Sequence, residues 1–474
     1  MGFSPHLGSD SGPHRREGRR LTQRTVVWCV SLCVLFSLVV VGIWYGVRAV
    51  TPQPLPLGTG TNPASAVTVQ QAISLPASGR EPVIGVVTTF GDDAEGSAWR
   101  LNAQGARVAQ YRLALGNSSV KVLYANDKGT EQGAREAVEK LSSEGALGIV
   151  LASRGEHLRG ATAAAKERNV AVIEAYDRVD AGDGVWSFAL DPEQEKQVYT
   201  TAIRSLAGAS STGSSQQLNG VRTILLDAGE GSAPDLPYTN RVQVSADEDG
   251  MKDTLKELTR LLGDKSSGSS PVLVLTGSAS TQAKVLRSLQ RAGITSPVIA
   301  GEEALTEPFI RLLLENGGSL TDNIRIVGRV QARAAALSAD DAGRASSAFV
   351  STVERMKNDS SLKDLSGEQS FSKSAVWADA PSHNALLAFA YATSQVREYT
   401  PEAVRRVLGT LRLDAKDSTV AYPLDFSSSY AAGGQVGLLY PTAEASMIQG
   451  GSSSTDAVNP PVWMLRTFTS ESRD

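Results

Sequence analysis

Short apolar segments of β-strand type alternate with longer amphipathic segments along most of this chain, and this alternation constrains the fold more than any other feature. A first series predicts strands at 82–90, 120–127, 147–153, 170–176 and 185–190, with helical patterns between them. A helix expected at 192–206 leads to a second series, with strands at 221–231, 242–246, 271–278, 297–305 and 325–330. Strands that alternate with helices form parallel sheets covered by helices. The sequence therefore predicts an α/β protein with two doubly wound parallel-sheet lobes.

The part of the chain that follows predicts helices first and strands afterwards. Helices are expected at 342–356, from Pro381 onward, and after Thr400, which suits an N-cap followed by Pro401 at the first helical position. Strands are expected again at 423–428, 434–441 and 462–468. This tail should complete both lobes, so the chain is expected to cross between them more than once. The N-terminal lobe would comprise residues 80–190 and about 335–415, and the C-terminal lobe residues 191–334 and about 416–470.

Residues 26–47 form an apolar run without a charge, which predicts one transmembrane helix. At about 1.5 Å per residue this run is long enough to cross a hydrocarbon core of about 30 Å. Five arginines precede the run and only Arg48 closely follows it, so the basic tail 1–25 is expected in the cytoplasm and the rest outside the cell membrane. A cleaved signal peptide is the alternative, but the run exceeds the usual apolar region of such peptides, and Trp44 and Tyr45 suit a membrane interface.

Residues 48–79 are rich in Pro, Gly and Thr and predict a stalk between the membrane and the folded part. The only cysteines are Cys29 and Cys33, within the apolar run, so no disulfide is expected outside the membrane. Residues 1–50 carry six arginines against Asp10 and Glu17, a net charge of +4, and the whole chain carries −4, which leaves −8 for residues 51–474. An acidic exterior argues against nucleic acid as a partner.

The sequence carries no strong catalytic, cofactor or metal signature. Residues 245–256 resemble a calcium loop, but Lys256 stands where such a loop needs a glutamate, so a solvated turn that caps the next helix is the better interpretation. Residues 229–231 lack the rest of a phosphate-binding motif, and no Gly-x-Ser-x-Gly motif is present. His157 and His383 lie far apart in sequence and suit structural roles. The chain is therefore not expected to be an enzyme, and neither a cofactor nor a metal is expected.

The order of these segments resembles the type 1 periplasmic binding protein fold, in particular the leucine/isoleucine/valine-binding family of branched-chain amino acid ABC transporter receptors. The resemblance covers about 80–468 and is carried by five segments: VIGVVTTFGDDAEGSAWRLNAQGARVA, LGIVLASRGEH, VAVIEAYDRV, PVIAGEEALTEP and PLDFSSSYAAGGQVGLL. It implies that a ligand sits between the lobes at the carboxyl ends of the strands. One departure is the stretch GSAPDLPYTNR at 231–241, where family members carry a full helix and this chain predicts a short one or none.

The resemblance also implies which residues would bind the ligand. They follow the strands of both lobes and are Ser153, Arg154, Ala175, Tyr176, Thr276, Gly277 and Glu303. Ser153 and Arg154 match the loop that meets a ligand carboxylate, and Glu303 matches the acid that holds an ammonium group. Thr276 and Gly277 match a wall of the pocket. Glu303 could instead be a carboxylate at a helix N-terminus, and Arg154 and Tyr176 could be rim residues.

These features favour a membrane-tethered solute-binding protein that captures a small polar ligand, such as an amino acid, for an ABC transporter permease or a membrane sensor. A second hypothesis keeps the fold without the ligand: a degenerate receptor domain that acts in protein–protein interaction at the cell surface. An extracellular enzyme is the weakest of the three hypotheses, because nucleophile, metal and acid–base pairs are all missing from the sequence.

Overall fold

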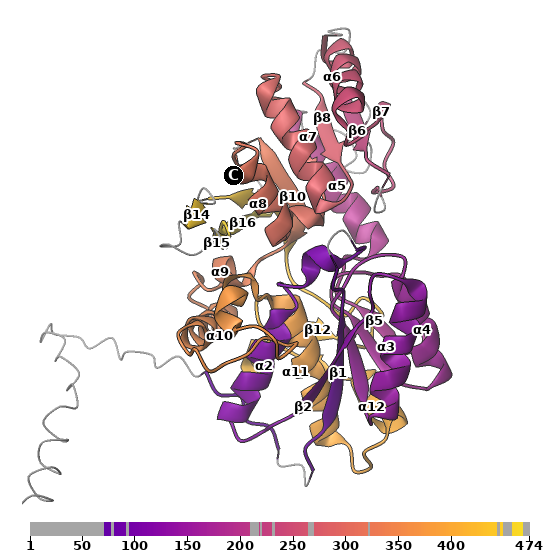
Figure 1. Cartoon of the computed structure of the whole chain (residues 1–474), viewed down its shortest axis with the longest axis vertical. Helices are drawn as coiled ribbons and strands as arrows, with labels where there is room; N and C mark the ends of the chain where they lie inside the picture. The colour runs from indigo at the N-terminus through magenta and orange to yellow at the C-terminus, as the bar shows by residue number, and fades with distance from the viewer. Residues whose placement is uncertain are drawn as a thin grey trace, which may run out of the picture. The chain divides into compact units, whose positions relative to one another are not determined.

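The computed structural model describes residues 71–467 apart from 77–79, 92–93, 209–217, 219, 230–232, 264–269, 321–322, 443–445 and 449–456, and these residues form two α/β lobes (Figure 1). The basic tail, the apolar run 26–47 and nearly all of the stalk lie outside the described residues. Within the described part, no helix combines the length and the apolarity that a membrane crossing requires.

The N-terminal lobe contains a parallel sheet of order β2-β1-β3-β4-β5. Its strands are β1 (Val83–Thr88), β2 (Lys121–Asn126), β3 (Gly148–Leu151), β4 (Ala171–Glu174) and β5 (Val185–Ser187). Helices α3 (Glu131–Ser143) and α4 (Leu158–Glu167) pack on one face. The other face packs against α2 (Gln104–Leu115), α10 (Asp341–Lys357), α11 (Ala380–Gln395) and α12 (Pro401–Leu408). The predicted parallel sheet is therefore present, and helices from the later part of the chain cover one of its faces.

Local sequence explains how these helices begin and how closely one of them approaches the sheet. The Thr400 hydroxyl accepts a hydrogen bond from the Ala403 N–H at 3.2 Å, so the predicted N-cap of α12 is confirmed. On β3, Gly148 lies under the ring of Phe389 from α11, and a Cβ atom at this position would collide with that ring. A glycine within this buried strand thus allows a phenylalanine of α11 to pack directly on the backbone.

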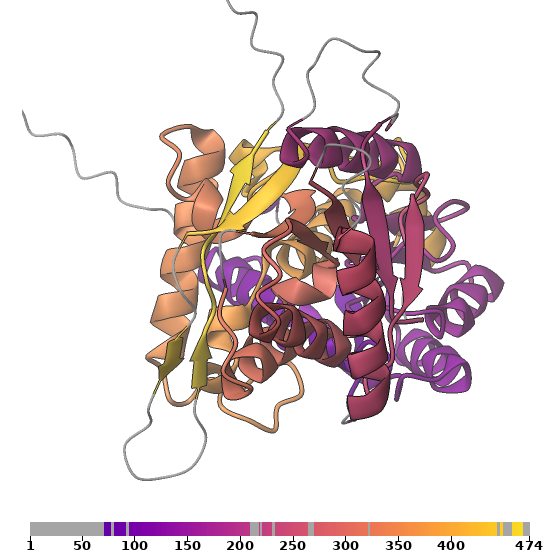
Figure 2. The ribbon, with the colours of Figure 1, turned by 90° about the horizontal axis from the view of Figure 1, so that it is seen from above.

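The C-terminal lobe contains a sheet of order β16-β13-β10-β9-β8-β6-β7. Its strands are β6 (Thr223–Asp227), β7 (Asn240–Gln243), β8 (Val272–Leu275), β9 (Val298–Ala300), β10 (Ile324–Arg329), β13 (Val436–Pro441) and β16 (Trp463–Arg466). One face packs against α6 (Glu248–Gly263), α7 (Ala279–Arg291) and α8 (Glu307–Glu315), and the other against α5 (Pro192–Leu206). Figure 2 shows α5 across the sheet from α6.

The expectation of a wholly parallel second sheet needs a correction at one edge. Strands β6 to β10 are parallel, but β13 is antiparallel to β10, and β16 is antiparallel to β13 (Figure 2). Antiparallel neighbours need no helical crossover, so the end of the chain can add both strands at the edge without further helices. A short antiparallel pair, β14 (Ser446–Ile448) with β15 (Ala457–Asn459), lies in the segment between β13 and β16.

The connection between β6 and β7 contains no helix among its described residues, 228–229 and 233–239, as the prolines there predicted. Leu236 and Tyr238 pack instead against the apolar cluster under α5. β6 and β7 are parallel strands, yet the described residues that join them do not form the usual crossover helix.

Three segments carry the chain between the lobes. Phe188 packs in the N-terminal core and Leu190 in the C-terminal core, which locates the first crossing. Val327 packs in the C-terminal core and Ala332 in the N-terminal core, so the second crossing lies between them. The third crossing follows Ala432, which still packs in the N-terminal core. The sequence placed the last return near residue 416, but 420–432 pack in the N-terminal core, where β11 (Arg412–Leu413) pairs with β12 (Leu424–Asp425).

Short helices complete the described part. They are η1 (Ser97–Trp99), η2 (Glu302–Leu305), α9 (Ala332–Ala335), η3 (Phe371–Lys373), η4 (Ala375–Trp377) and η5 (Ala415–Asp417). Two of them bring the lobes into contact: Trp377 of η4 is buried in the C-terminal core, and Ala98 of η1 packs against that core as well. The lobes are thus in apolar contact beside the carboxyl ends of their central strands.

Candidate functional site

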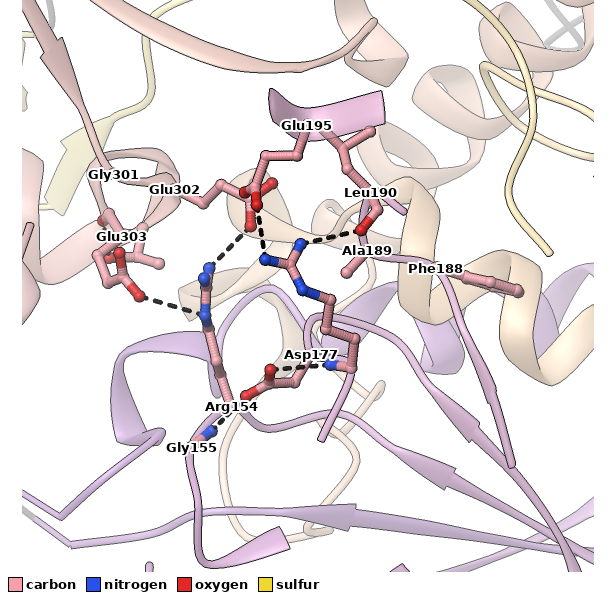
Figure 3. Close-up of polar contacts among 12 residues, drawn as sticks. Arg154, Gly155, Asp177, Phe188, Ala189, Leu190, Glu195, Gly301, Glu302 and Glu303 are labelled. Carbon is pink, nitrogen blue, oxygen red and sulfur yellow. Dashed lines mark hydrogen bonds and ion pairs between the residues drawn. The ribbon is translucent and has the colours of Figure 1, made fainter. Parts of the chain in front are cut away.

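The predicted binding residues lie just beyond the carboxyl ends of four strands, two in each lobe. Arg154 follows β3 in the N-terminal lobe, and Glu302 and Glu303 open η2 directly after β9 in the C-terminal lobe. The side chain of Arg154 reaches across between the lobes: its Nη1 lies 2.8 Å from Glu302 Oε2, and its Nε lies 3.3 Å from Glu303 Oε1 (Figure 3). The structure therefore brings together two residues that the sequence separates by about 150 positions, Arg154 and Glu303.

The bridge between Arg154 and its two glutamates is partly shielded from solvent. The side chains of Arg154, Glu302 and Glu303 retain 23%, 29% and 17% of their accessible surface. Burial disfavours the charge of Arg154, but the carboxylates of Glu303 and Glu302 outweigh this effect and raise the pKa of the guanidinium above its ordinary value. Arg154 is therefore a fixed positive charge between the lobes, and both glutamates pair with it.

A second ion pair lies beside the first, and its residues were not predicted from the sequence. Arg178, in the loop after β4, contacts Glu195 of α5 at 2.6 Å and donates to the Leu190 carbonyl at 2.9 Å (Figure 3). Burial raises the pKa of the Glu195 carboxyl, Arg178 opposes the rise, and the nearby Glu302 adds to it. The neighbouring ion pairs thus contain two guanidinium groups and three carboxylates.

Asp177 organises the backbone below these ion pairs. Its carboxylate accepts hydrogen bonds from the Gly155 N–H at 2.7 Å and from the Arg178 N–H at 2.8 Å. It therefore ties the loop that carries Arg154 to the loop that carries Arg178 (Figure 3). Charge-assisted bonds of this kind are stronger than neutral ones and fix both loops together.

The hydroxyl of Ser153 belongs to a buried series of hydrogen-bonded side chains in the N-terminal lobe. Thr89 Oγ1 donates to Asp127 Oδ1 at 2.6 Å, and Ser153 Oγ lies 2.5 Å from Thr89 Oγ1. Since the Thr89 hydroxyl has one hydrogen and Asp127 takes it, Ser153 must be the donor to Thr89. The single hydroxyl hydrogen of Ser153 is therefore used in the bond to Thr89. The Ser153 oxygen can still accept a hydrogen bond, but this side chain cannot donate one to a ligand carboxylate.

The same series of side chains continues to His157, which the sequence assigned to a structural role. His157 Nε2 lies 3.2 Å from Asp127 Oδ2, and its Nδ1 lies 2.9 Å from Glu95 Oε2. Burial alone would lower the pKa of His157, but these two carboxylates outweigh it and raise the pKa. His383 of α11 is fully buried on the opposite face of the sheet, with its Nε2 3.0 Å from Arg112 Nη1. Both histidines are therefore interior residues of the N-terminal lobe.

Of the two predicted residues after β4, only Tyr176 presents a polar group. Ala175 is buried in the N-terminal core. The ring of Tyr176 stacks on that of Trp99 with centroids 4.5 Å apart, and its hydroxyl donates to Asp379 Oδ1 at 3.0 Å. Burial raises the pKa of Asp379 to about 7, although bonds from Ser382 and Tyr176 oppose the rise. Trp99 also lies under Arg154, whose guanidinium carbon is 5.9 Å from the ring centroid, so these two buried, stacked rings form an aromatic floor beneath the ion pair.

In the C-terminal lobe, Gln282 fixes the loops that carry Gly277 and Glu303. Its amide donates to the Gly277 carbonyl at 2.7 Å and to Glu303 Oε2 at 3.2 Å, and it accepts from the Gly301 N–H at 3.0 Å. Thr276 is buried with its hydroxyl 3.5 Å from the Leu226 carbonyl, and Gly277 has a φ of 120°. Thr276 and Gly277 therefore shape the backbone of the loop after β8 and offer no free side-chain donor there. Gln282 holds the carboxylate of Glu303 in position.

We expect the substitution Gln282→Leu to lower the free energy of unfolding by about 1–3 kcal/mol, because it leaves buried backbone groups of two loops without partners. Urea unfolding of the full-length chain in detergent, followed by tryptophan fluorescence, would measure this loss. The control Gln132→Leu, on the exposed face of α3, should change stability by less than about 0.5 kcal/mol. Equal stability of both variants would contradict the positioning role of Gln282.

Among the described residues, no group of three histidine, cysteine or acidic side chains is arranged to hold a metal ion. In the stretch that resembles a calcium loop, Asp247 accepts from the Gly250 N–H at 2.9 Å at the start of α6. The interpretation of this stretch as a helix-capping turn is therefore confirmed.

No family model and no curated protein sequence matches this chain. Three solved structures that match it over most of its length do so at low sequence identity. A leucine-binding protein from Thermotoga maritima matches with a TM-score of 0.56 at 15% identity, covering 81% of this chain and 99% of the other. An ABC transporter substrate-binding protein from Desulfitobacterium hafniense, in complex with leucine, gives 0.54 at 13%, covering 81% and 100%.

A branched-chain amino acid transporter substrate-binding protein from Streptococcus pneumoniae, in complex with isoleucine, matches with a TM-score of 0.51 at 14% identity, covering 76% of this chain and 100% of the other. With two lobes, three crossings and charged residues at the facing strand ends, the chain has the type 1 periplasmic binding protein fold. The predicted fold is thereby confirmed, and the proteins that share it are named for binding solutes rather than for catalysis.

Proposed function

We propose that this chain is a solute-binding protein that holds a small zwitterionic ligand, an α-amino acid, between its two lobes. The observation that carries this proposal is the ion pair between Arg154 of one lobe and Glu303 of the other. The two side chains offer the charges that an amino acid needs, a cation for its carboxylate and a carboxylate for its ammonium group. Opening of the lobes separates these charges, and a zwitterion that enters between them satisfies both.

The aromatic floor and the anchored loops support this arrangement. A guanidinium group can bind a carboxylate through two parallel N–H donors, so Arg154 provides directional binding as well as charge. Gln282 and Asp177 hold the loops of Glu303 and Arg154 in place, which reduces the entropy lost on binding. Two of the proteins with this fold were solved in complex with isoleucine and with leucine, which are zwitterions of this class.

The setting of this binding is also part of the proposal. The apolar run 26–47 would anchor the chain as a single-pass membrane protein with its N-terminus in the cytoplasm and its lobes outside the cell. A stalk of residues 48–79 then limits its partners to those beside the same membrane, such as a transporter permease or a sensor protein. Labelling of an engineered cysteine at Ser418, which lies on the folded part, by a membrane-impermeant maleimide on intact cells would test this topology; protection until the cells are lysed would contradict it.

We expect the substitution Glu303→Gln to weaken amino-acid binding by about 10- to 100-fold, since an ammonium group would lose its charged partner in a shielded site. Thermal shift of the full-length chain in detergent, screened against the common amino acids, would measure binding. A ligand at about 100 times its dissociation constant adds roughly 2.7 kcal/mol of stability, which raises the melting temperature by several degrees. The exposed control Glu315→Gln should bind like the wild type.

A second candidate function, protein–protein interaction without a small ligand, has its own supporting observations. Arg154 already neutralises Glu303, the hydrogen of Ser153 is already used by Thr89, and the described residues between β6 and β7 form no helix. If no amino acid shifts the melting temperature of the wild type, solute binding of this kind is contradicted. This second function then becomes the better one.

A further inference from the structure

The ion-paired side chains between the lobes carry more negative than positive charges. This excess of negative charge indicates which kind of ligand would bind there. Arg178 pairs with Glu195, whereas Arg154 is shared between Glu302 and Glu303 (Figure 3). Two guanidinium groups thus face three carboxylates, and one negative charge has no cation of its own. Asp177 adds a further carboxylate, but two backbone N–H groups stabilise it.

Binding of a ligand carboxylate by Arg154 would make this imbalance larger. Arg154 would then serve the ligand, and both Glu302 and Glu303 would lose their present partner. The α-ammonium group of an amino acid can replace Arg154 at only one of them, Glu303. A carboxylate left without a cation in a closing, partly dehydrated cleft is costly, so an aliphatic amino acid would bind with an uncompensated charge at Glu302.

Other cations near Glu302 are already engaged. Arg178 contacts Glu195 at 2.6 Å and the Leu190 carbonyl at 2.9 Å. Arg329, the buried guanidinium of the second crossing, donates to three backbone carbonyls. Neither can serve Glu302 fully without giving up a buried interaction, so the missing cation has to come from the ligand.

We propose that the ligand is a dibasic α-amino acid, such as lysine or ornithine, whose side-chain ammonium group pairs with Glu302. This inference rests on the proposed solute-binding function and specifies its ligand class. Arg154 binds the carboxylate, Glu303 binds the α-ammonium group, and Glu302 selects the cationic side chain. The stem of such a side chain is apolar and suits the aromatic floor formed by Trp99 and Tyr176.

Lysine and norleucine make a matched pair of probes, because norleucine has the same chain length and lacks the side-chain ammonium group. With the full-length chain in detergent, calorimetric titration should show lysine binding at least 10-fold more tightly than norleucine. The substitution Glu302→Gln should abolish this preference, with lysine binding at least 10-fold weaker and norleucine binding tighter, since the uncompensated charge is gone. The exposed control Glu315→Gln should keep the preference.

The outcomes separate this inference from the function on which it rests. If norleucine or leucine binds the wild type as tightly as lysine, the inference is wrong while the proposed function stands. If lysine, norleucine and leucine all fail to bind, the proposed function fails and the inference with it. The comparison of lysine with norleucine uses only the wild type, so it decides the matter even if Glu302→Gln does not fold.

Discussion

Replacement of Arg329 by methionine should lower the free energy of unfolding by about 3–5 kcal/mol, among the largest effects of any single substitution in this chain. Arg329 ends β10 at the second crossing and retains 9% of its accessible surface. It donates to the carbonyl of Phe188 at 2.9 Å in the first crossing. It also donates to the carbonyls of Ala432 at 2.6 Å and Gly433 at 3.0 Å in the third. One side chain therefore joins all three segments that connect the lobes.

The size of this effect follows from the groups that methionine would leave behind. Methionine fills similar space but has no donor, so three carbonyls in the crossings would lose a charge-assisted hydrogen bond. Lysine retains the charge but cannot place donors in three directions as the planar guanidinium does, so Arg329→Lys should lose an intermediate amount. Urea unfolding of each variant would give the free energies.

The exposed control Arg291→Met, at the end of α7, should change stability by less than about 0.5 kcal/mol. Loss of less than about 1 kcal/mol in Arg329→Met would mean that water or backbone movement compensates for the missing donors. The structural role of Arg329 between the crossings would then be refuted.

The substitution Glu174→Gln should stabilise the protein by about 4 kcal/mol near pH 8.5 and have little effect near pH 4.5. Glu174 ends β4 and is fully buried, and neither carboxyl oxygen makes a well-aligned hydrogen bond among the described residues, although the backbone N–H groups of Val179 and Asp180 weakly favour its anion. Burial raises its pKa from 4.5 to about 8, and Asp177 and Asp180 add to the rise. In the folded chain the carboxyl therefore stays protonated across most of the neutral range.

The direction of the pH dependence follows from that raised pKa. Below pH 4.5 the carboxyl is protonated in both the folded and the unfolded chain, so its contribution to stability is fully present. As the pH rises from 4.5 to about 8, the unfolded chain ionises first, and the contribution is lost at about 1.4 kcal/mol per pH unit. Glutamine does not ionise, so the variant escapes this loss.

Urea unfolding of wild type and variant at pH 5 and pH 8.5 would measure the two differences. The exposed control Glu144→Gln should show no such pH dependence relative to the wild type. Other buried acids, such as Asp379 with its pKa raised to about 7, act equally in both proteins and cancel in the comparison. A stability difference that is the same at both pH values would show that Glu174 does not titrate as described.

Much of the fold could be predicted from the sequence, because its determinants are local. The alternation of strand and helix segments follows from side-chain periodicity, and the start of α12 follows from Thr400 and Pro401. The lack of a helix at 233–239, between β6 and β7, follows from prolines at 234 and 237. The last crossing was placed too early because β11 and β12 are two-residue strands, too short to leave a periodic pattern.

The site was predicted in part, through the resemblance to a known fold. Arg154 and Glu303 were assigned opposite charges of the ligand, and the structure brings them within 3.3 Å of each other. Arg178, Glu195 and Gln282 were not predicted, because the role of each depends on a contact with a residue in another loop or lobe. A charged residue in the loop that follows a strand was the one available signal, and it applies to Arg178 after β4 as well as to Arg154 after β3.

The sequence by itself determined that this chain forms two α/β lobes with their polar loops at the strand ends, since each strand and helix is set by neighbouring residues. Only the tertiary structure decided which charges meet there. Arg154 is shared by two glutamates and Arg329 joins three crossings because segments 100 or more residues apart fold side by side. Such contacts depend on the packing of whole lobes, which leaves no local pattern along the chain.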